Sequence, residues 1–71
     1  MKKTVDARGL DCPLPVIEAK KALQNTEGVL EVIVDNEIAL QNLEKMAKQM
    51  ALSYELKTVS ADQHVITIMV D

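Results

Sequence analysis

The sequence has few of the residues that stabilise small secreted domains. Its 71 residues include one cysteine, so no disulfide can form within the chain. A lone thiol in so short a chain is typical of a reducing compartment. We expect one small domain that spans residues 1–71, because a chain of this length has surface for only one core.

Long apolar stretches are also absent. Lys2 and Lys3 are followed by Thr4-Val5-Asp6-Ala7-Arg8 instead of the apolar core of a signal peptide. No apolar run approaches the roughly 20 residues that cross a bilayer. We therefore expect a cytoplasmic protein with no membrane association.

Aromatic and basic side chains are scarce. Tyr54 is the only aromatic residue and the net charge is −3, whereas nucleic-acid modules usually carry a basic face and stacking aromatics. One cysteine, one histidine and scattered carboxylates give none of the ligand spacings of a zinc site. The composition argues against a nucleic-acid partner, a metal site and a bound cofactor.

The chain does contain an alternation of strand and helix patterns. β-Branched or alternating segments predict strands over residues 4–7, 29–34, 54–59 and 64–70. Helical spacing predicts one helix from Cys12 or Pro13 to Gln24 or Asn25, and a second that is capped by Asp35 or Asn36. The order βαβαββ predicts an α/β (α+β) two-layer sandwich, in which two helices cover one face of a four-stranded mixed sheet.

The pattern also predicts which residues are buried. Residues 29–34 are apolar almost throughout, which is typical of an inner strand. Gly28 and residues 60–63 are the expected turns, and Gly9 is free to adopt a positive φ before the first helix. The expected buried helix positions are Val16, Ala19, Ala22 and Leu23 in the first helix, and Ala39, Leu43, Met46, Ala47 and Met50 in the second.

The lone cysteine stands in the run Asp11-Cys12-Pro13-Leu14-Pro15 at the predicted helix start. A helix N-terminus favours a thiolate over a thiol, and the thiolate is the reactive form. Pro15 removes one N–H that would bind the sulfur, and Asp11 adds a neighbouring negative charge that Arg8 could offset. We expect a moderately activated thiol, held in a turn that the two prolines stiffen.

Other kinds of cysteine chemistry fit less well. A buried, inert core cysteine is the common fate of a free thiol, but the flanking aspartate and prolines favour an exposed one. No second cysteine is present, which excludes a dithiol redox cycle. A Cys–His hydrolase would need His64 close by, and we expect His64 to be an ordinary turn or strand-edge residue.

The run from Asp6 to Val16 resembles the signature of the TusA/SirA/YedF sulfur-carrier family, whose hallmark is Cys-Pro-x-Pro. The likeness extends over the chain in length and in element order. It implies that Cys12 accepts a persulfide sulfur, while Pro13 and Pro15 serve as motif scaffold together with Gly9 and Asp11. Such a protein is a carrier within a sulfurtransferase relay and not a stand-alone enzyme.

The resemblance also implies partners. In this family a cysteine desulfurase supplies the sulfur, and a DsrE-like or other acceptor protein takes it towards tRNA thiolation or another sulfur-dependent pathway. Two alternatives stay open. Residues 36–43 resemble the YedF-like branch, which implies selenium metabolism, and SirA-type members imply a regulatory or protein-interaction module. The sequence indicates no oligomeric state.

Overall fold

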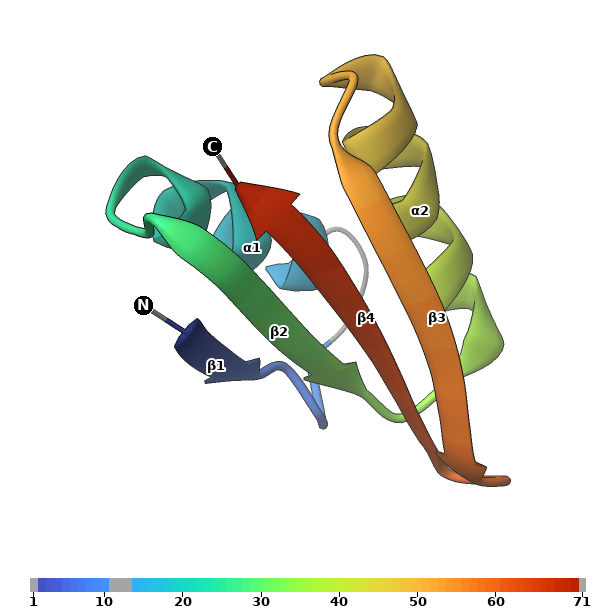
Figure 1. Cartoon of the computed structure of the whole chain (residues 1–71). Helices are drawn as coiled ribbons and strands as arrows, with labels where there is room; N and C mark the ends of the chain where they lie inside the picture. Colours follow the sequence, from blue (N-terminus) through green and yellow to red (C-terminus); the bar gives the residue numbers. More distant parts are fainter. Residues whose placement is uncertain (1, 11–13, 71) are drawn as a thin grey trace.

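The computed structural model of the chain describes residues 2–10 and 14–70. The described elements alternate as the sequence predicts, which confirms the order βαβαββ (Figure 1). They are β1 (Lys2–Asp6), α1 (Leu14–Gln24), β2 (Gly28–Val34), α2 (Glu37–Gln49), β3 (Ser53–Ser60) and β4 (Gln63–Val70). The start predicted for the first helix, at Cys12 or Pro13, lies outside the described residues.

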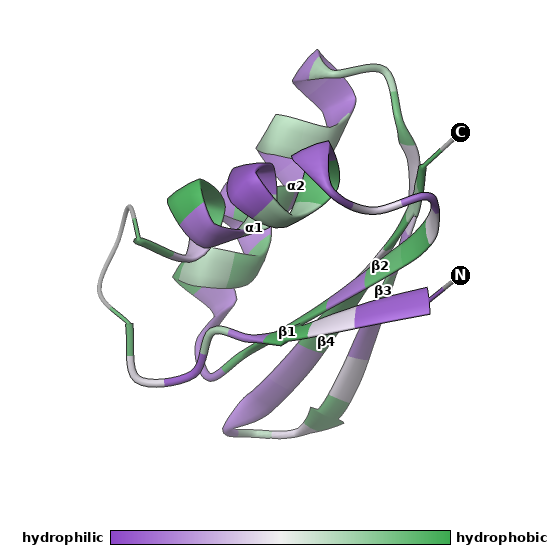
Figure 2. Ribbon diagram, turned by 90° about the vertical axis from the view of Figure 1, so that its left-hand side faces the viewer, coloured by the Kyte–Doolittle hydropathy of each residue, from purple (hydrophilic) through white to green (hydrophobic). Residues whose placement is uncertain are grey.

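The four strands form one mixed sheet in the order β1-β2-β4-β3. β1 and β2 are parallel, whereas β4 is antiparallel to both β2 and β3. Both helices lie on the same side of the sheet (Figure 2). The predicted two-layer sandwich is therefore confirmed, and β2 is an inner strand as expected.

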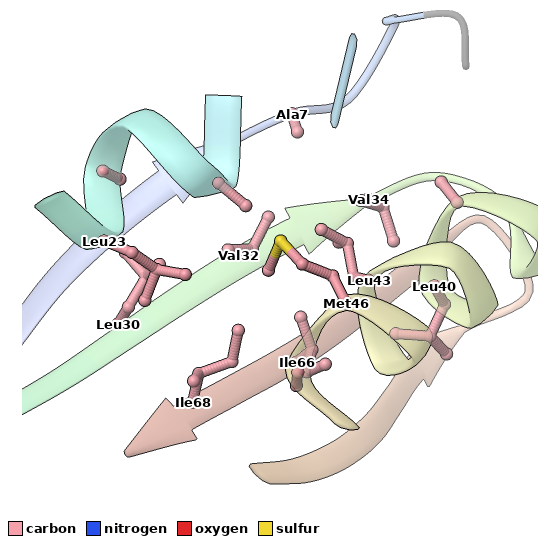
Figure 3. Packing of buried hydrophobic residues seen from close by; sticks show 14 residues of the cluster. Ala7, Leu23, Leu30, Val32, Val34, Leu40, Leu43, Met46, Ile66 and Ile68 are labelled. Atoms are coloured by element: carbon pink, nitrogen blue, oxygen red, sulfur yellow. The ribbon is translucent and has the colours of Figure 1, made fainter. Parts of the chain in front are cut away.

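The core lies between this sheet and the helices. Burial alternates along β2, because side chains of a strand point to opposite faces in turn, and Leu30, Val32 and Val34 are fully buried. Figure 3 shows Val32 and Val34 close to Met46 and Leu43 of α2, and Leu30 close to Leu23 of α1. Ile66 and Ile68 of β4 lie on the same side of the sheet. Each fully buried aliphatic side chain contributes about 1.5–3 kcal/mol, so these residues are the main stabilisers of a small domain.

The helix faces agree with the sequence except at their ends. Ala19, Ala22 and Leu23 are buried as predicted, but Val16 is only half-buried and Pro15 takes the buried position one turn before Ala19. Helix α1 ends at Gln24, within the predicted range. The position of Pro15 in the first turn is free of cost, since no intrahelical acceptor exists there for its missing N–H.

In α2 the prediction for Met50 is wrong. The helix ends at Gln49, and Ala51 has a φ of +58°, so the backbone turns away and the Met50 side chain is 46% exposed. Leu40 joins the other predicted positions in the core instead. Asn36 is the N-cap, as one of the two predicted residues, and its Oδ1 accepts the N–H of Ala39 at 2.8 Å.

The expectation for His64 is also wrong. This residue lies on the inner strand β4, opposite Val34, and only 3% of its surface is exposed. Its Nδ1 is 3.1 Å from the hydroxyl of Thr58, while its Nε2 is buried and has no hydrogen-bond partner among the described residues. β4 lies between two other strands, and the helices cover its core face, so a side chain near its first residue is still enclosed.

Candidate functional site

The connection between β1 and α1 is the candidate site, because the predicted sulfur acceptor lies in it. Cys12, together with Asp11 and Pro13, lies outside the described residues. The described residues on either side of these three are Gly9 and Leu10 before them and Leu14 and Pro15 after them. These residues show how the fold holds the chain on either side of residues 11–13.

Parallel pairing of β1 and β2 determines where the connection begins. The carboxyl ends of the two strands reach the same edge of the sheet, with Asp6 opposite Ile33 (Figure 1). The pairing continues one residue further, since the Ala7 N–H donates to the carbonyl of Ile33 at 2.8 Å. Ala7 is 1% exposed. The chain therefore leaves the sheet from a firmly packed residue.

Gly9 turns the chain away from the sheet. Its φ is +79°, as the sequence predicts for this position, and a residue without Cβ adopts this conformation without steric penalty. Its N–H donates to Oδ2 of Asp35 at 2.9 Å. Asp35 directly follows β2, so this bond joins the connection after β1 to the connection between β2 and α2.

The Arg8 guanidinium forms a bidentate interaction with the Asp6 carboxylate. Its Nε lies 2.9 Å from Oδ1 and its Nη2 lies 2.8 Å from Oδ2, and its backbone N–H donates to Oδ1 as well. These hydrogen bonds lower the pKa of Asp6 to about 2, and they raise the pKa of Arg8. The sequence left open whether Arg8 offsets the charge of Asp11, which lies outside the described residues. The structure places the Arg8 guanidinium on Asp6.

Asp35 is a residue of the site that sequence reasoning missed. The sequence predicts for Asp35 only a role as an alternative cap of the second helix. Its Oδ2 accepts from Gly9 and its Oδ1 accepts from Nδ2 of Asn36 at 2.9 Å, and these bonds lower the pKa of the Asp35 carboxyl. The βαβ order does contain a signal, because it is typical of two parallel strands, and the residues that follow such strands reach one edge of the sheet.

The first turn of α1 borders the site on its other side. Pro15 is fully buried, whereas Leu14 and Ile17 are 44% and 40% exposed and lie three residues apart on one helix face. The first turn contains no acidic side chain. No acidic side chain in this turn therefore offsets the positive end of the helix dipole, which would favour an anion close to the helix start.

Two further features of the described residues concern metal ligands and membrane-spanning helices. Residues 2–10 and 14–70 contain no cluster of three or more His, Cys, Asp or Glu side chains that could hold a metal ion. None of the described helices is long and apolar enough to cross a membrane.

Known proteins share this architecture. Residues 3–70 match the model of a family described as sulfurtransferase TusA. The crystal structure of a SirA-like protein from Desulfitobacterium hafniense superimposes with a TM-score of 0.87 at 44% sequence identity, and the match covers 94% of this chain and 95% of that one. The likeness therefore includes both the sequence and the fold.

Relatives with sulfur-carrier names are also similar. A protein of Thermotoga maritima, provisionally named a sulfur carrier, is 38% identical over 50 residues, which are 68% of this chain and 63% of that protein. The sulfur carrier protein TusA of Allochromatium vinosum is 40% identical over 47 residues, which are 63% of this chain and 62% of that protein. The match thus spans slightly less than two thirds of the length of these curated relatives.

Proposed function

The chain belongs to the TusA family, whose model matches residues 3–70, and we propose that it is a sulfur carrier that holds a persulfide sulfur on Cys12. The observation that carries the proposal is the position of the only cysteine. Cys12 stands in the Cys-Pro-Leu-Pro run that joins β1 to the N-terminal end of α1.

The proposed step is an exchange between sulfur atoms. The Cys12 thiolate attacks the outer sulfur of a persulfide on a donor cysteine, a new S–S bond forms on Cys12, and the donor cysteine leaves as a thiolate. In the second half, the thiolate of an acceptor protein takes the outer sulfur, and Cys12 leaves as a thiolate. No external oxidant or reductant is consumed, because each step breaks one S–S bond and forms another.

The residues that border the site support a moderately activated thiol. The N-terminal end of α1 favours a nearby anion, and no acid in its first turn cancels this effect. Arg8 lies in the segment before Cys12, and its guanidinium is bound to Asp6. A carrier must release its sulfur as well as accept it, and moderate activation suits both half-reactions.

The partners belong to the proposal as well. A persulfide donor of the cysteine desulfurase type would load Cys12, and a DsrE-like or other protein with a free cysteine would receive the sulfur. A selenium cargo, which the resemblance of residues 36–43 to the YedF-like branch implies, stays a prediction from the sequence. The scaffold roles of Gly9, Asp11, Pro13 and Pro15 are part of the same proposal.

The test is a loading experiment. The protein is incubated with a cysteine desulfurase and cysteine, and its intact mass is measured before and after reduction. We expect a gain of one sulfur atom that reduction removes and that the Cys12→Ser variant does not show. A wild-type protein that stays at its original mass, or a gain that persists in Cys12→Ser, would overturn the proposal.

A second candidate is a module that acts by binding alone. The observation that favours it is the set of exposed apolar side chains on the first turns of both helices, namely Leu14, Ile17 and Ile38, the last of which is 67% exposed. Complementation of a strain that lacks the gene separates the two functions. A Cys12→Ser protein that restores the phenotype as well as the wild type does would favour the binding module.

A further inference from the structure

We propose that Asp35 is a positioning residue for sulfur transfer, because it anchors the chain segment that leads to Cys12. This inference rests on the proposed function. It goes beyond it by assigning a role to a residue outside the Cys-Pro-Leu-Pro run, on the connection between β2 and α2.

The anchoring contact joins segments that are far apart in the sequence. Oδ2 of Asp35 accepts the N–H of Gly9 at 2.9 Å across a separation of 26 residues. Gly9 precedes Cys12 by three residues, and its φ of +79° turns the chain at this point. The bond therefore holds the backbone at a point three residues before Cys12 in the sequence.

The other contacts of Asp35 keep its carboxylate in place. Oδ1 accepts from Nδ2 of Asn36, and Oδ1 of Asn36 in turn accepts the N–H of Ala39 in the first turn of α2. Both carboxylate oxygens of Asp35 therefore accept a hydrogen bond, Oδ2 from Gly9 and Oδ1 from Asn36. A carboxylate that is held from its own helix end is a fixed acceptor, and the Gly9 backbone is fixed with it.

Sulfur transfer is sensitive to such a contact. Two sulfur atoms must approach in line on the surfaces of two docked proteins, and a displacement of about 1 Å in such a geometry can lower the rate by about 100-fold. A small reagent in solution has no fixed orientation to Cys12, so it does not depend on the anchor in the same way. The loss of Asp35 is therefore expected to affect transfer between proteins more than reaction with a small molecule.

The experiment compares three variants of the full chain. Asp35→Ala removes the acceptor, and Asp35→Asn keeps one oxygen that can accept from Gly9. Asp62→Ala removes an exposed carboxylate from the turn between β3 and β4 as a control. For each protein, the rate of persulfide loading from a desulfurase and the rate of alkylation by iodoacetamide are measured well below its thermal midpoint.

We expect Asp35→Ala to be loaded about tenfold more slowly than the wild type, while its alkylation rate stays unchanged. Asp35→Asn should recover most of the loading rate, and Asp62→Ala should behave as the wild type does. Equal loading of Asp35→Ala and the wild type would overturn the inference. Equal losses in loading and alkylation would overturn it as well, since they would indicate a general effect on the thiol.

A spectroscopic readout in the wild type keeps the inference testable if Asp35→Ala does not fold. The amide proton of Gly9 should shift as acid protonates the Asp35 carboxylate, and this titration should be absent in Asp35→Asn. An amide that does not respond in the wild type would contradict the anchor. Failure of the proposed function looks different, because the wild-type protein itself would then not take up sulfur on Cys12.

Discussion

Replacement of Gly9 tests the backbone geometry that leads into the site. Gly9 has a φ of +79°, and a Cβ added there would meet no heavy atom within 4 Å. A substitution therefore causes no clash, and its cost comes from the backbone conformation alone. This separation of the two effects makes the position suitable for a quantitative prediction.

The left-handed region costs an ordinary L-residue about 1–2 kcal/mol. An alanine also restricts the unfolded chain, which returns about 0.4–1 kcal/mol. We expect Gly9→Ala to lower the free energy of unfolding by about 1 kcal/mol, which corresponds to a fall of about 4–8 °C in Tm for a domain of this size. Gly9→Asn should cost less, because asparagine tolerates this region, and Gly9→Val should cost more.

The assay is urea unfolding followed by circular dichroism, with Tm as a second measure. The dependence of the unfolding free energy on urea should be the same in all variants, because the substitutions do not change the buried surface. The order of stability should be glycine, asparagine, alanine and then valine. Equal stability of the asparagine and valine variants, or an alanine variant as stable as the wild type, would refute the reasoning.

Three further predictions concern the core, the helix cap and acid stability. Leu43→Ala should cost about 3 kcal/mol or more in urea unfolding, because Leu43 is fully buried, whereas Leu56→Ala at a 43% exposed site should cost less than about 1 kcal/mol. Asn36→Ala should remove the cap bond to α2 and cost about 1 kcal/mol. The Tm of the wild type should fall more steeply than that of Asp6→Asn as the pH drops from about 4 to about 2.

The sign of the acid effect follows from the lowered pKa of Asp6. A carboxyl group whose pKa is lower in the folded state stabilises the fold above its unfolded pKa, and this contribution is lost as the pH falls through the folded pKa of about 2. Parallel Tm curves for the wild type and Asp6→Asn would contradict this prediction. For the core and the cap, the contradicting results are equal losses at Leu43 and Leu56, and an Asn36→Ala protein with an unchanged Tm.

Much of the fold could be predicted because its signals are local. The order of strands and helices, the positive φ of Gly9 and the Asn36 cap all depend on residues close together in the chain. Gly28, which the sequence predicts to be a turn residue, is instead the first residue of β2. The prediction that Met50 is buried was wrong for a related reason. Helical spacing continues through it, whereas the helix ends one residue before it, and helix ends are the least certain part of a periodic pattern.

The candidate site, like the fold, could be predicted only where its signal is local. Its cysteine and prolines could be found from the sequence, because they form one short run. The pair of Arg8 and Asp6 is also local, but the bond from Gly9 to Asp35 depends on which strands lie side by side, and the sequence did not identify it. The bond between Gly9 and Asp35 exists because β1 and β2 are parallel neighbours, and His64 is buried because β4 lies between β2 and β3.

The sequence by itself therefore determined the element order, the apolar faces and the identity of the candidate sulfur acceptor, because side-chain periodicity and a contiguous motif are properties of neighbouring residues. The tertiary structure alone decided that His64 is enclosed and that Asp35 holds Gly9. The pairing of strands brings distant backbone groups to one sheet edge, and no local pattern records which distant residue arrives there.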